Sequence, residues 1–147
     1  VVGSLSVLTT RKGDLSGAMV ASWVSQASFT PPGLTVAVAK DRAVESLLQK
    51  GDCFAMNLLA EGRESGPMKQ FLQQFDPGAD RFAGLELEQS PSEQPLLPEA
   101  LAWLECSVKQ RMECGDHWLL YAEVTHGGVL DSESTTAVHH RRSGANY

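Results

Sequence analysis

Alternation of apolar and polar residues predicts short antiparallel strands over most of the chain. The clearest alternation runs from Leu101 to Met112, where every second side chain from Leu104 is apolar or small except Gln110, as in a half-buried strand. A Gly-Asp turn separates it from the apolar run Trp118–Thr125, which His126-Gly-Gly128 would end. The two runs therefore predict a hairpin.

The first third of the chain predicts three more strands. Gly3–Thr10 and the small-residue stretch from Leu15 flank Arg11-Lys-Gly-Asp14, whose Gly and Asp favour a hairpin turn. Leu34–Ala39 is apolar on both faces, which is typical of a central strand that is covered on both sides. Cys53–Leu59 is a further short apolar strand, interrupted by one polar residue.

Two helices are expected between these strands. Asp41 can cap a helix over about Arg42 to Lys50 that stops at Gly51. A second helix begins near Ser65 and ends at the turn of residues 76–78, with one apolar stripe formed by Met68, Phe71, Leu72 and Phe75. Residues 80–98 are acidic and rich in proline, which predicts a loop with little regular structure.

The expected fold is mainly β, with at least six short strands and two inserted helices. Closing such a strand set removes its exposed edges, so a closed or partly split antiparallel barrel is favoured. A sandwich of two sheets is the alternative.

Composition narrows the class of protein. A chain of 147 residues fits one domain. Twelve basic against eighteen acidic residues give a net charge of −6, which argues against a nucleic-acid partner. No apolar run approaches the roughly 20 residues of a membrane span, and the three cysteines, without metal or redox spacing, indicate reduced thiols in a cytoplasmic protein. The start at Val1 suggests a module cut from a longer chain.

Three places in the first half could bind a ligand. Small residues of Gly17–Pro32 would let a planar ligand approach the backbone, with Ser22 and Ser25 as hydrogen-bonding groups beside it. Lys40 and Arg42 flank a helix start, which together could form an anion site; the alternative is a solvated charge pair with an ordinary cap. Asn57 must satisfy its amide either with backbone groups or with a ligand, and the sequence leaves both open.

His117 is the candidate for chemistry in the second half. It follows Gly115-Asp116 at a predicted hairpin tip, where it could donate a hydrogen bond, stack on a ring or titrate near neutrality, or simply be a surface turn histidine. The remaining histidines lack chelating spacing, so no metal site is expected. Neither the Gly-x-Ser-x-Gly elbow nor the Gly-x-Gly-x-x-Gly dinucleotide motif occurs in the chain.

Two of these stretches resemble motifs of the flavin reductase-like family. Ala18–Trp23 with Pro31-Pro32 resembles the family's strand segment, and Gly115-Asp-His117 after Glu105-Cys106 resembles its hairpin motif. The likeness is strongest to the C-terminal flavin reductase module of cyanobacterial flavodiiron proteins, and it covers nearly the whole chain. The segments that carry it are Ser22–Ser28, Val38–Ser46, Arg111–Trp118 and Ala137–Arg141.

The resemblance implies an FMN-binding split β-barrel, antiparallel and Greek-key-like, with two or three short helices. It implies an NAD(P)H:flavin oxidoreductase whose electrons feed a diiron site for reduction of O2 to water. The expected partners are flavin and nicotinamide nucleotides, the diiron and flavodoxin-like domains of the same polypeptide, and a second copy in a homodimer or flavodiiron oligomer. His117 would position flavin or nicotinamide, the ring would lie against residues 20–23 and the phosphate at residues 40–46. The expected cofactor contacts are Val20, Ala21, Ser22, Trp23, Ser25, Lys40, Asp41, Arg42, Ser46, Asn57 and Tyr147.

An alternative function of another class is a non-catalytic barrel that serves for dimerisation or docking, with a weak or empty flavin site. Val20 and Trp23 support it, because they stand where the resembled family has hydroxyl residues.

Overall fold

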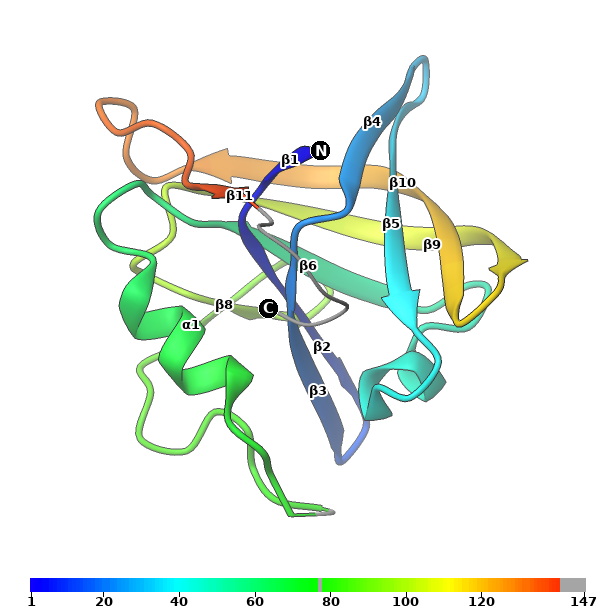
Figure 1. Cartoon of the computed structure of the whole chain (residues 1–147), viewed down its shortest axis with the longest axis horizontal. Helices are drawn as coiled ribbons and strands as arrows, with labels where there is room; N and C mark the ends of the chain where they lie inside the picture. The colour runs from blue at the N-terminus through cyan, green and yellow to red at the C-terminus, as the bar shows by residue number, and fades with distance from the viewer. Residues whose placement is uncertain (77, 141–147) are drawn as a thin grey trace.

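One antiparallel sheet of seven strands dominates the computed structural model, which describes residues 1–76 and 78–140 (Figure 1). The strand order is β3-β2-β6-β9-β10-β5-β4, and β3 and β4 form the two edges. The sheet curls around an apolar core and is split between these edges, which confirms the predicted mainly β, split-barrel class. The strands are β1 Val2–Ser4, β2 Ser6–Lys12, β3 Leu15–Ala21, β4 Val24–Phe29, β5 Pro32–Ala39, β6 Cys53–Leu58, β7 Glu88–Gln89, β8 Pro95–Leu96, β9 Ala102–Cys114, β10 His117–Val129 and β11 Val138–His140.

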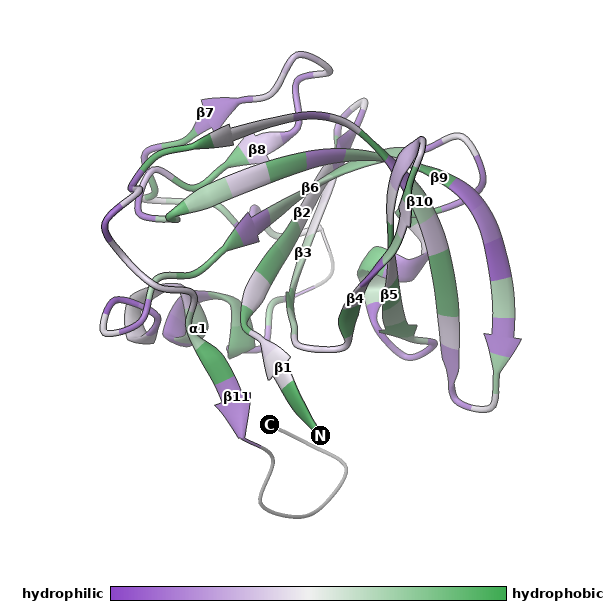
Figure 2. Cartoon of the chain, turned by 90° about the horizontal axis from the view of Figure 1, so that it is seen from above, coloured by the Kyte–Doolittle hydropathy of each residue, from purple (hydrophilic) through white to green (hydrophobic). Residues whose placement is uncertain are grey.

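The β9–β10 hairpin is the longest element and confirms the predicted alternation. Polar and apolar residues alternate along β9 from Leu104 to Val108, whereas β10 opens with the apolar run Trp118–Ala122 (Figure 2). The expected end of β10 at residues 126–128 is wrong, because the strand continues to Val129. Gly127 pairs with Leu104 and Gly128 with Trp103 after a register shift near Val124, so the bulge carries the strand on instead of ending it.

The predicted helix over residues 42–50 is only a 3₁₀ turn, η1 Ala43–Leu47. Arg42 occupies its N-cap position and makes no side-chain capping bond, so the expected cap by Asp41 is wrong. Packing determines this turn instead, since Val44 and Leu47 are buried against β3. A Cβ on Gly17 of β3 would lie 2.8 Å from a Val44 methyl group, so only glycine permits this approach.

Helix α1 Ser65–Leu72 covers the sheet near β3 (Figure 1) and confirms the predicted packing helix, although it ends before Phe75. It contributes Phe71 to a second apolar cluster, which also contains Phe82 and Leu97 from the segment predicted as a loop. That segment is mostly irregular, as expected, apart from the two-residue strands β7 and β8.

Strand β5 differs from its prediction. Val36 and Val38 are buried, but the alternate residues Thr35, Ala37 and Ala39 are half-buried, so the strand is not covered equally on both faces. The reason is its place in the sheet, between β10 and the edge strand β4. Neither helix in the described part of the chain is long and apolar enough to cross a membrane.

Candidate functional site

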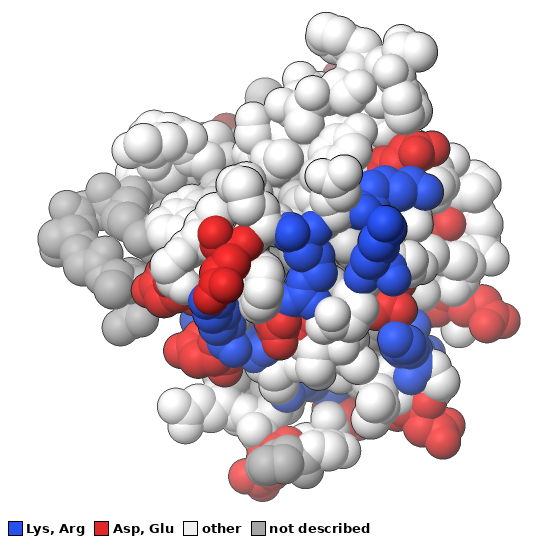
Figure 3. Space-filling view, turned by 90° about the vertical axis from the view of Figure 1, so that its right-hand side faces the viewer, with Lys and Arg blue, Asp and Glu red and all other residues white. Residues whose placement is uncertain are grey.

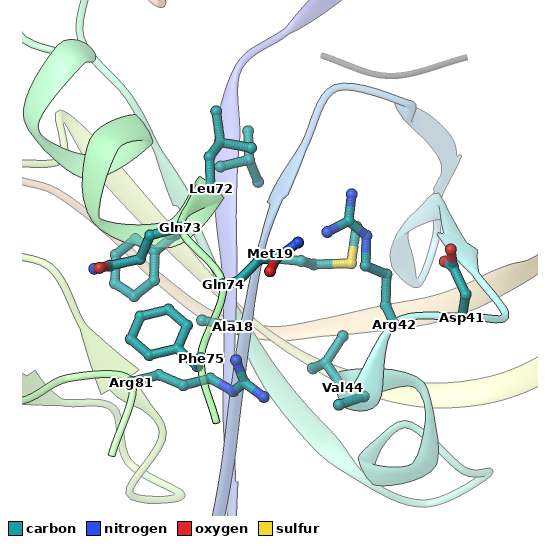
Figure 4. Close-up of a pocket in the computed structure, with 13 residues that line it drawn as sticks. Ala18, Met19, Asp41, Arg42, Val44, Leu72, Gln73, Gln74, Phe75 and Arg81 are labelled. Atoms are coloured by element: carbon teal, nitrogen blue, oxygen red, sulfur yellow. The ribbon is translucent and has the colours of Figure 1, made fainter. Parts of the chain in front are cut away.

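A pocket of about 310 Å³ lies where β3, η1 and the segment after α1 meet (Figure 4). Ala18–Val20 of β3 lie in the middle of the pocket, and residues 41–44 lie on one side of them (Figure 4). Residues 71–75 and Arg81 complete it. The structure therefore brings three predicted site residues, Val20, Asp41 and Arg42, into one pocket.

The pocket combines an apolar wall with two cationic groups. Arg42 and Arg81 reach toward β3 from opposite sides (Figure 4). The Arg81 guanidinium lies 5.1 Å from the centre of the Phe75 ring, which restricts its orientation. Such an arrangement suits a flat ligand that carries a phosphate group.

Sequence reasoning did not find Arg81 or the segment 73–75. The sequence predicts only a loop for residues 80–98, and it predicts Phe75 only as part of a helix stripe. One signal was available, because Arg81 is a single cation next to the apolar Phe82 in an otherwise acidic segment. Its approach to β3 depends on burial of Phe82, which the sequence alone does not show.

Lys40 lies outside this pocket, although its neighbours in sequence line it. Its ammonium pairs with Glu113 and lies 5.4 Å from the ring centre of Trp118. The hydrogen bond from Lys40 lowers the pKa of the Glu113 carboxyl. Figure 3 shows this side of the molecule, where Lys and Arg side chains stand among Asp and Glu side chains.

The predicted hydroxyl residues lie in two neighbouring pockets. Ser46 donates to the carbonyl of Ala43 at 3.0 Å and lines a pocket of about 510 Å³ that shares Ala43 and Arg81 with the first. Ser22, Trp23 and Ser25 line a pocket of about 230 Å³ next to β1. Residues 18–25 thus connect the pocket of about 310 Å³ with the pocket of about 230 Å³, and the buried Ala21 lies between them in the chain.

His117 stands at the first position of β10 and lines none of these three pockets. Its Nδ1 lies 2.7 Å from Asp116 Oδ1, and this bond lowers the pKa of the Asp116 carboxyl. Its ring centre lies 4.8 Å from that of Trp23, with the planes inclined at 38°. A histidine fixed on two sides can present its free edge in one orientation.

Pairing between β5 and β10 relates His117 to the pocket. His117 pairs with Ala39, and the Lys40 N–H donates to the Asp116 carbonyl at 2.9 Å. Arg42 follows Ala39 by three residues, which span at most about 11 Å of extended chain. The β5–β10 pairing and the turn after β5 therefore keep His117 and Arg42 close to each other in the fold.

Asn57 belongs to the core. Its amide donates to the Val7 carbonyl and to Thr9 Oγ1, and its Oδ1 accepts from the Leu97 N–H. The structure thus favours the interpretation that Asn57 holds backbone in place, and we leave it out of the proposed site. Tyr147 lies outside the described residues.

Comparison with known proteins gives consistent results. The family model described as flavin reductase like domain matches residues 2–146. Diflavin flavoprotein A 3 and diflavin flavoprotein A 1 of Synechocystis sp. are 60% and 56% identical over all 147 residues, which make up 24% and 26% of those proteins. The chain thus spans about a quarter of the length of these relatives.

A solved structure shows the same fold. The NADH:FAD oxidoreductase of Streptomyces globisporus C-1027 superimposes with a TM-score of 0.84 at 23% identity, and covers 100% of this chain and 89% of its own. That enzyme has also been solved in complex with NAD and FAD fragments.

Proposed function

The chain belongs to the flavin reductase-like domain family, and on this premise we propose that it is an NAD(P)H:flavin oxidoreductase module that holds FMN between β3 and η1. In the longer protein, its electrons would pass to a diiron site that reduces O2 to water. The partners would be the diiron and flavodoxin-like domains of the same polypeptide, and a second copy in a homodimer or flavodiiron oligomer.

One observation carries the proposal: the pocket in which Ala18–Val20 face Arg42 and Arg81. Its volume of about 310 Å³ lies at the lower end of the range for small-molecule sites. Its largely apolar β3 wall suits an isoalloxazine ring, and its two guanidinium groups suit a phosphate. The residues present therefore fit FMN.

Each part of the site has a separate task. The β3 wall orients the flavin ring by apolar contact, and Arg42 and Arg81 hold the phosphate by charge-assisted hydrogen bonds. His117, fixed by Asp116 and Trp23, positions the nicotinamide next to the ring. Bound FMN would supply the hydride acceptor and NAD(P)H the donor, so no side chain need act as acid or base.

The names of the similar proteins support flavin and nicotinamide chemistry. Two are called diflavin flavoproteins, and the fold is shared with an enzyme named as an NADH:FAD oxidoreductase. These names support a flavin and a reduced nicotinamide as ligands of this chain.

The proposal predicts that Arg42→Ala weakens FMN binding by about 1.5–3 kcal/mol, because a charge-assisted bond to the phosphate is lost. Titration of flavin fluorescence would measure the dissociation constant. Lys50→Ala is the matched control, since Lys50 follows the same turn but does not line the pocket. Unchanged FMN affinity in Arg42→Ala would show that the FMN phosphate does not bind at Arg42.

Absorption spectra separate this function from the scaffold alternative. Protein that holds FMN absorbs in the visible, and NAD(P)H should bleach it under anaerobic conditions. Colourless protein that also fails to bind added FMN would favour a docking module instead.

A further inference from the structure

A cluster of ion pairs around one tryptophan connects η1 with the β9–β10 hairpin. Arg111 of β9 pairs with Glu45 of η1, and its guanidinium carbon lies 4.5 Å from the ring centre of Trp118. Lys40, at the end of β5, lies 5.4 Å from the same ring centre and pairs with Glu113 of β9. We call these five residues the Trp118 clamp.

The clamp lies between the two ends of the proposed site. Glu45 belongs to the same short turn that follows Arg42, at the phosphate end. Trp118 directly follows His117, at the nicotinamide end, and successive side chains of a strand point to opposite faces. An anchored Trp118 therefore holds the start of β10, and with it His117, in one position relative to η1.

Arg111 is the central member. Its side chain is only 11% exposed and that of its partner Glu45 22%, so this pair is less screened by water than the pair of Lys40 and Glu113. Its Nε is buried without a hydrogen-bond partner in the described part of the chain. The orientation of Arg111 thus depends on Glu45 and on the Trp118 ring.

Among the described residues, no other side chain of η1 pairs with the hairpin. The turn has five residues, no side-chain cap and no basic residue in its last turn. Its apolar residues, Val44 and Leu47, pack toward β3 and fix its distance from that strand. Its polar tie to the hairpin is the Arg111–Glu45 pair.

We propose that Arg111 is a positioning residue, which through Glu45 and Trp118 sets the spacing between Arg42 and His117. The inference rests on the proposed function, in which Arg42 binds the FMN phosphate and His117 positions the nicotinamide. The contacts of the Trp118 clamp themselves are present in the protein without ligand. It also gives Lys40 a role in place of phosphate binding.

Comparing FMN with riboflavin, which lacks the phosphate, tests the positioning. In Arg111→Gln we expect FMN affinity to fall by about tenfold, equivalent to a coupling of about 1.4 kcal/mol, while riboflavin affinity stays unchanged. Added to Arg42→Ala, the same substitution should cost no further FMN affinity. If Arg111→Gln instead caused a general loss of structure, it would weaken the binding of both FMN and riboflavin. Its loss of FMN affinity would then add to that of Arg42→Ala, and this result would overturn the proposal.

Lys109→Gln is the matched control, because Lys109 lies on the same strand and pairs with Glu123 at 3.8 Å, outside the clamp. It should leave both affinities unchanged. Arg111→Lys keeps the charge but loses the planar guanidinium group, so its FMN affinity should lie between those of the wild type and Arg111→Gln.

Hydrogen exchange provides a test that needs no flavin. The Glu45 and Leu48 amides, which donate to Arg42 and Glu45 within the turn, should exchange faster in Arg111→Gln and at the wild-type rate in Lys109→Gln. Unchanged exchange would overturn the clamp. If instead exchange changes but the wild type does not prefer FMN over riboflavin, the clamp stands and the phosphate site at Arg42 is wrong.

Discussion

His117 depends on its two immediate neighbours for its proposed role. Its Nδ1 is held by Asp116, and its ring packs against Trp23, which is itself 45% exposed. We predict that His117→Ala slows NAD(P)H-driven flavin reduction by about tenfold, since a ring contact contributes about 0.5–1.5 kcal/mol. FMN affinity should change little, because the histidine does not line the pocket.

Anaerobic stopped-flow absorbance would measure this rate. His140→Ala serves as control, because His140 is an exposed residue of β11. An unaltered reduction rate in His117→Ala would exclude the histidine from the mechanism.

Single residues also show what a sequence can and cannot predict. Val20 and Arg42 could be placed in one site, because a small-residue strand and a basic junction each have a local signature. Lys40 has the same local signature as Arg42, but its partner Glu113 is 73 residues away in the chain. Arg81 was missed for the same reason, since its place depends on a fold-back of the loop against β2 and β3.

Among the elements, the segment 88–97 is held against the sheet by polar contacts rather than by strand pairing alone. Glu105 of β9 is buried and accepts from the Ser92 N–H at 3.0 Å, while His126 lies 3.1 Å from its other oxygen. Thr9 donates to the Pro95 carbonyl at 2.6 Å. The Glu105 carboxylate is thus the charged group among the hydrogen bonds that hold the segment 88–97 against the sheet.

The charge of Glu105 should make this attachment dependent on pH. Burial raises the pKa of Glu105, but hydrogen bonds from Ser90, Ser92 and His126 outweigh it and leave the pKa below the value of 4.5 for a free glutamate. A lowered pKa in the folded state stabilises the protein above the unfolded pKa, and this stability is lost as pH falls through the folded value. We predict that Glu105→Gln lowers the free energy of unfolding by about 1–3 kcal/mol at pH 7.

Urea unfolding at several pH values would measure this effect. The difference between wild type and Glu105→Gln should begin to shrink as pH falls below about 4.5, and it should vanish below the lowered pKa of the folded state, where Glu105 is neutral in both states. A difference that stays constant with pH would mean that shape rather than charge holds the segment. The pKa values of Asp116 and Asp131 are lowered as well, but their contributions cancel in this comparison.

The helices show where element prediction failed. An apolar stripe was enough to find α1, but η1 is a 3₁₀ turn whose buried residues Val44 and Leu47 pack closely on Gly17 of β3. Capping signals predict a helix from local sequence alone, whereas η1 also depends on packing against β3, which the local sequence does not show. The long β9–β10 hairpin, by contrast, combines a local turn with a regular alternation, and both are visible in the sequence.

At the scale of the whole molecule, the two apolar clusters share the same strands. Strand β2 contributes Leu8 to the cluster inside the curled sheet and Val7 to the cluster under α1, and β3 divides Met19 and Val20 in the same way. Neither cluster can lose its structure without exposing the other face of these strands. The proposed flavin pocket lies at their junction, since Met19 and Val20 both line it.

We therefore predict one cooperative unfolding transition for this chain, with coincident near-UV and far-UV circular dichroism curves. FMN at about 100 times its dissociation constant should stabilise the folded state by about 2.7 kcal/mol, which corresponds to a rise in Tm of about 5–10 °C for a chain of this size. Arg42→Ala at the same FMN concentration should show a smaller rise, because less of it is bound. Two separate transitions, with only one of them shifted by FMN, would show instead that the clusters unfold independently and that the pocket belongs to one of them.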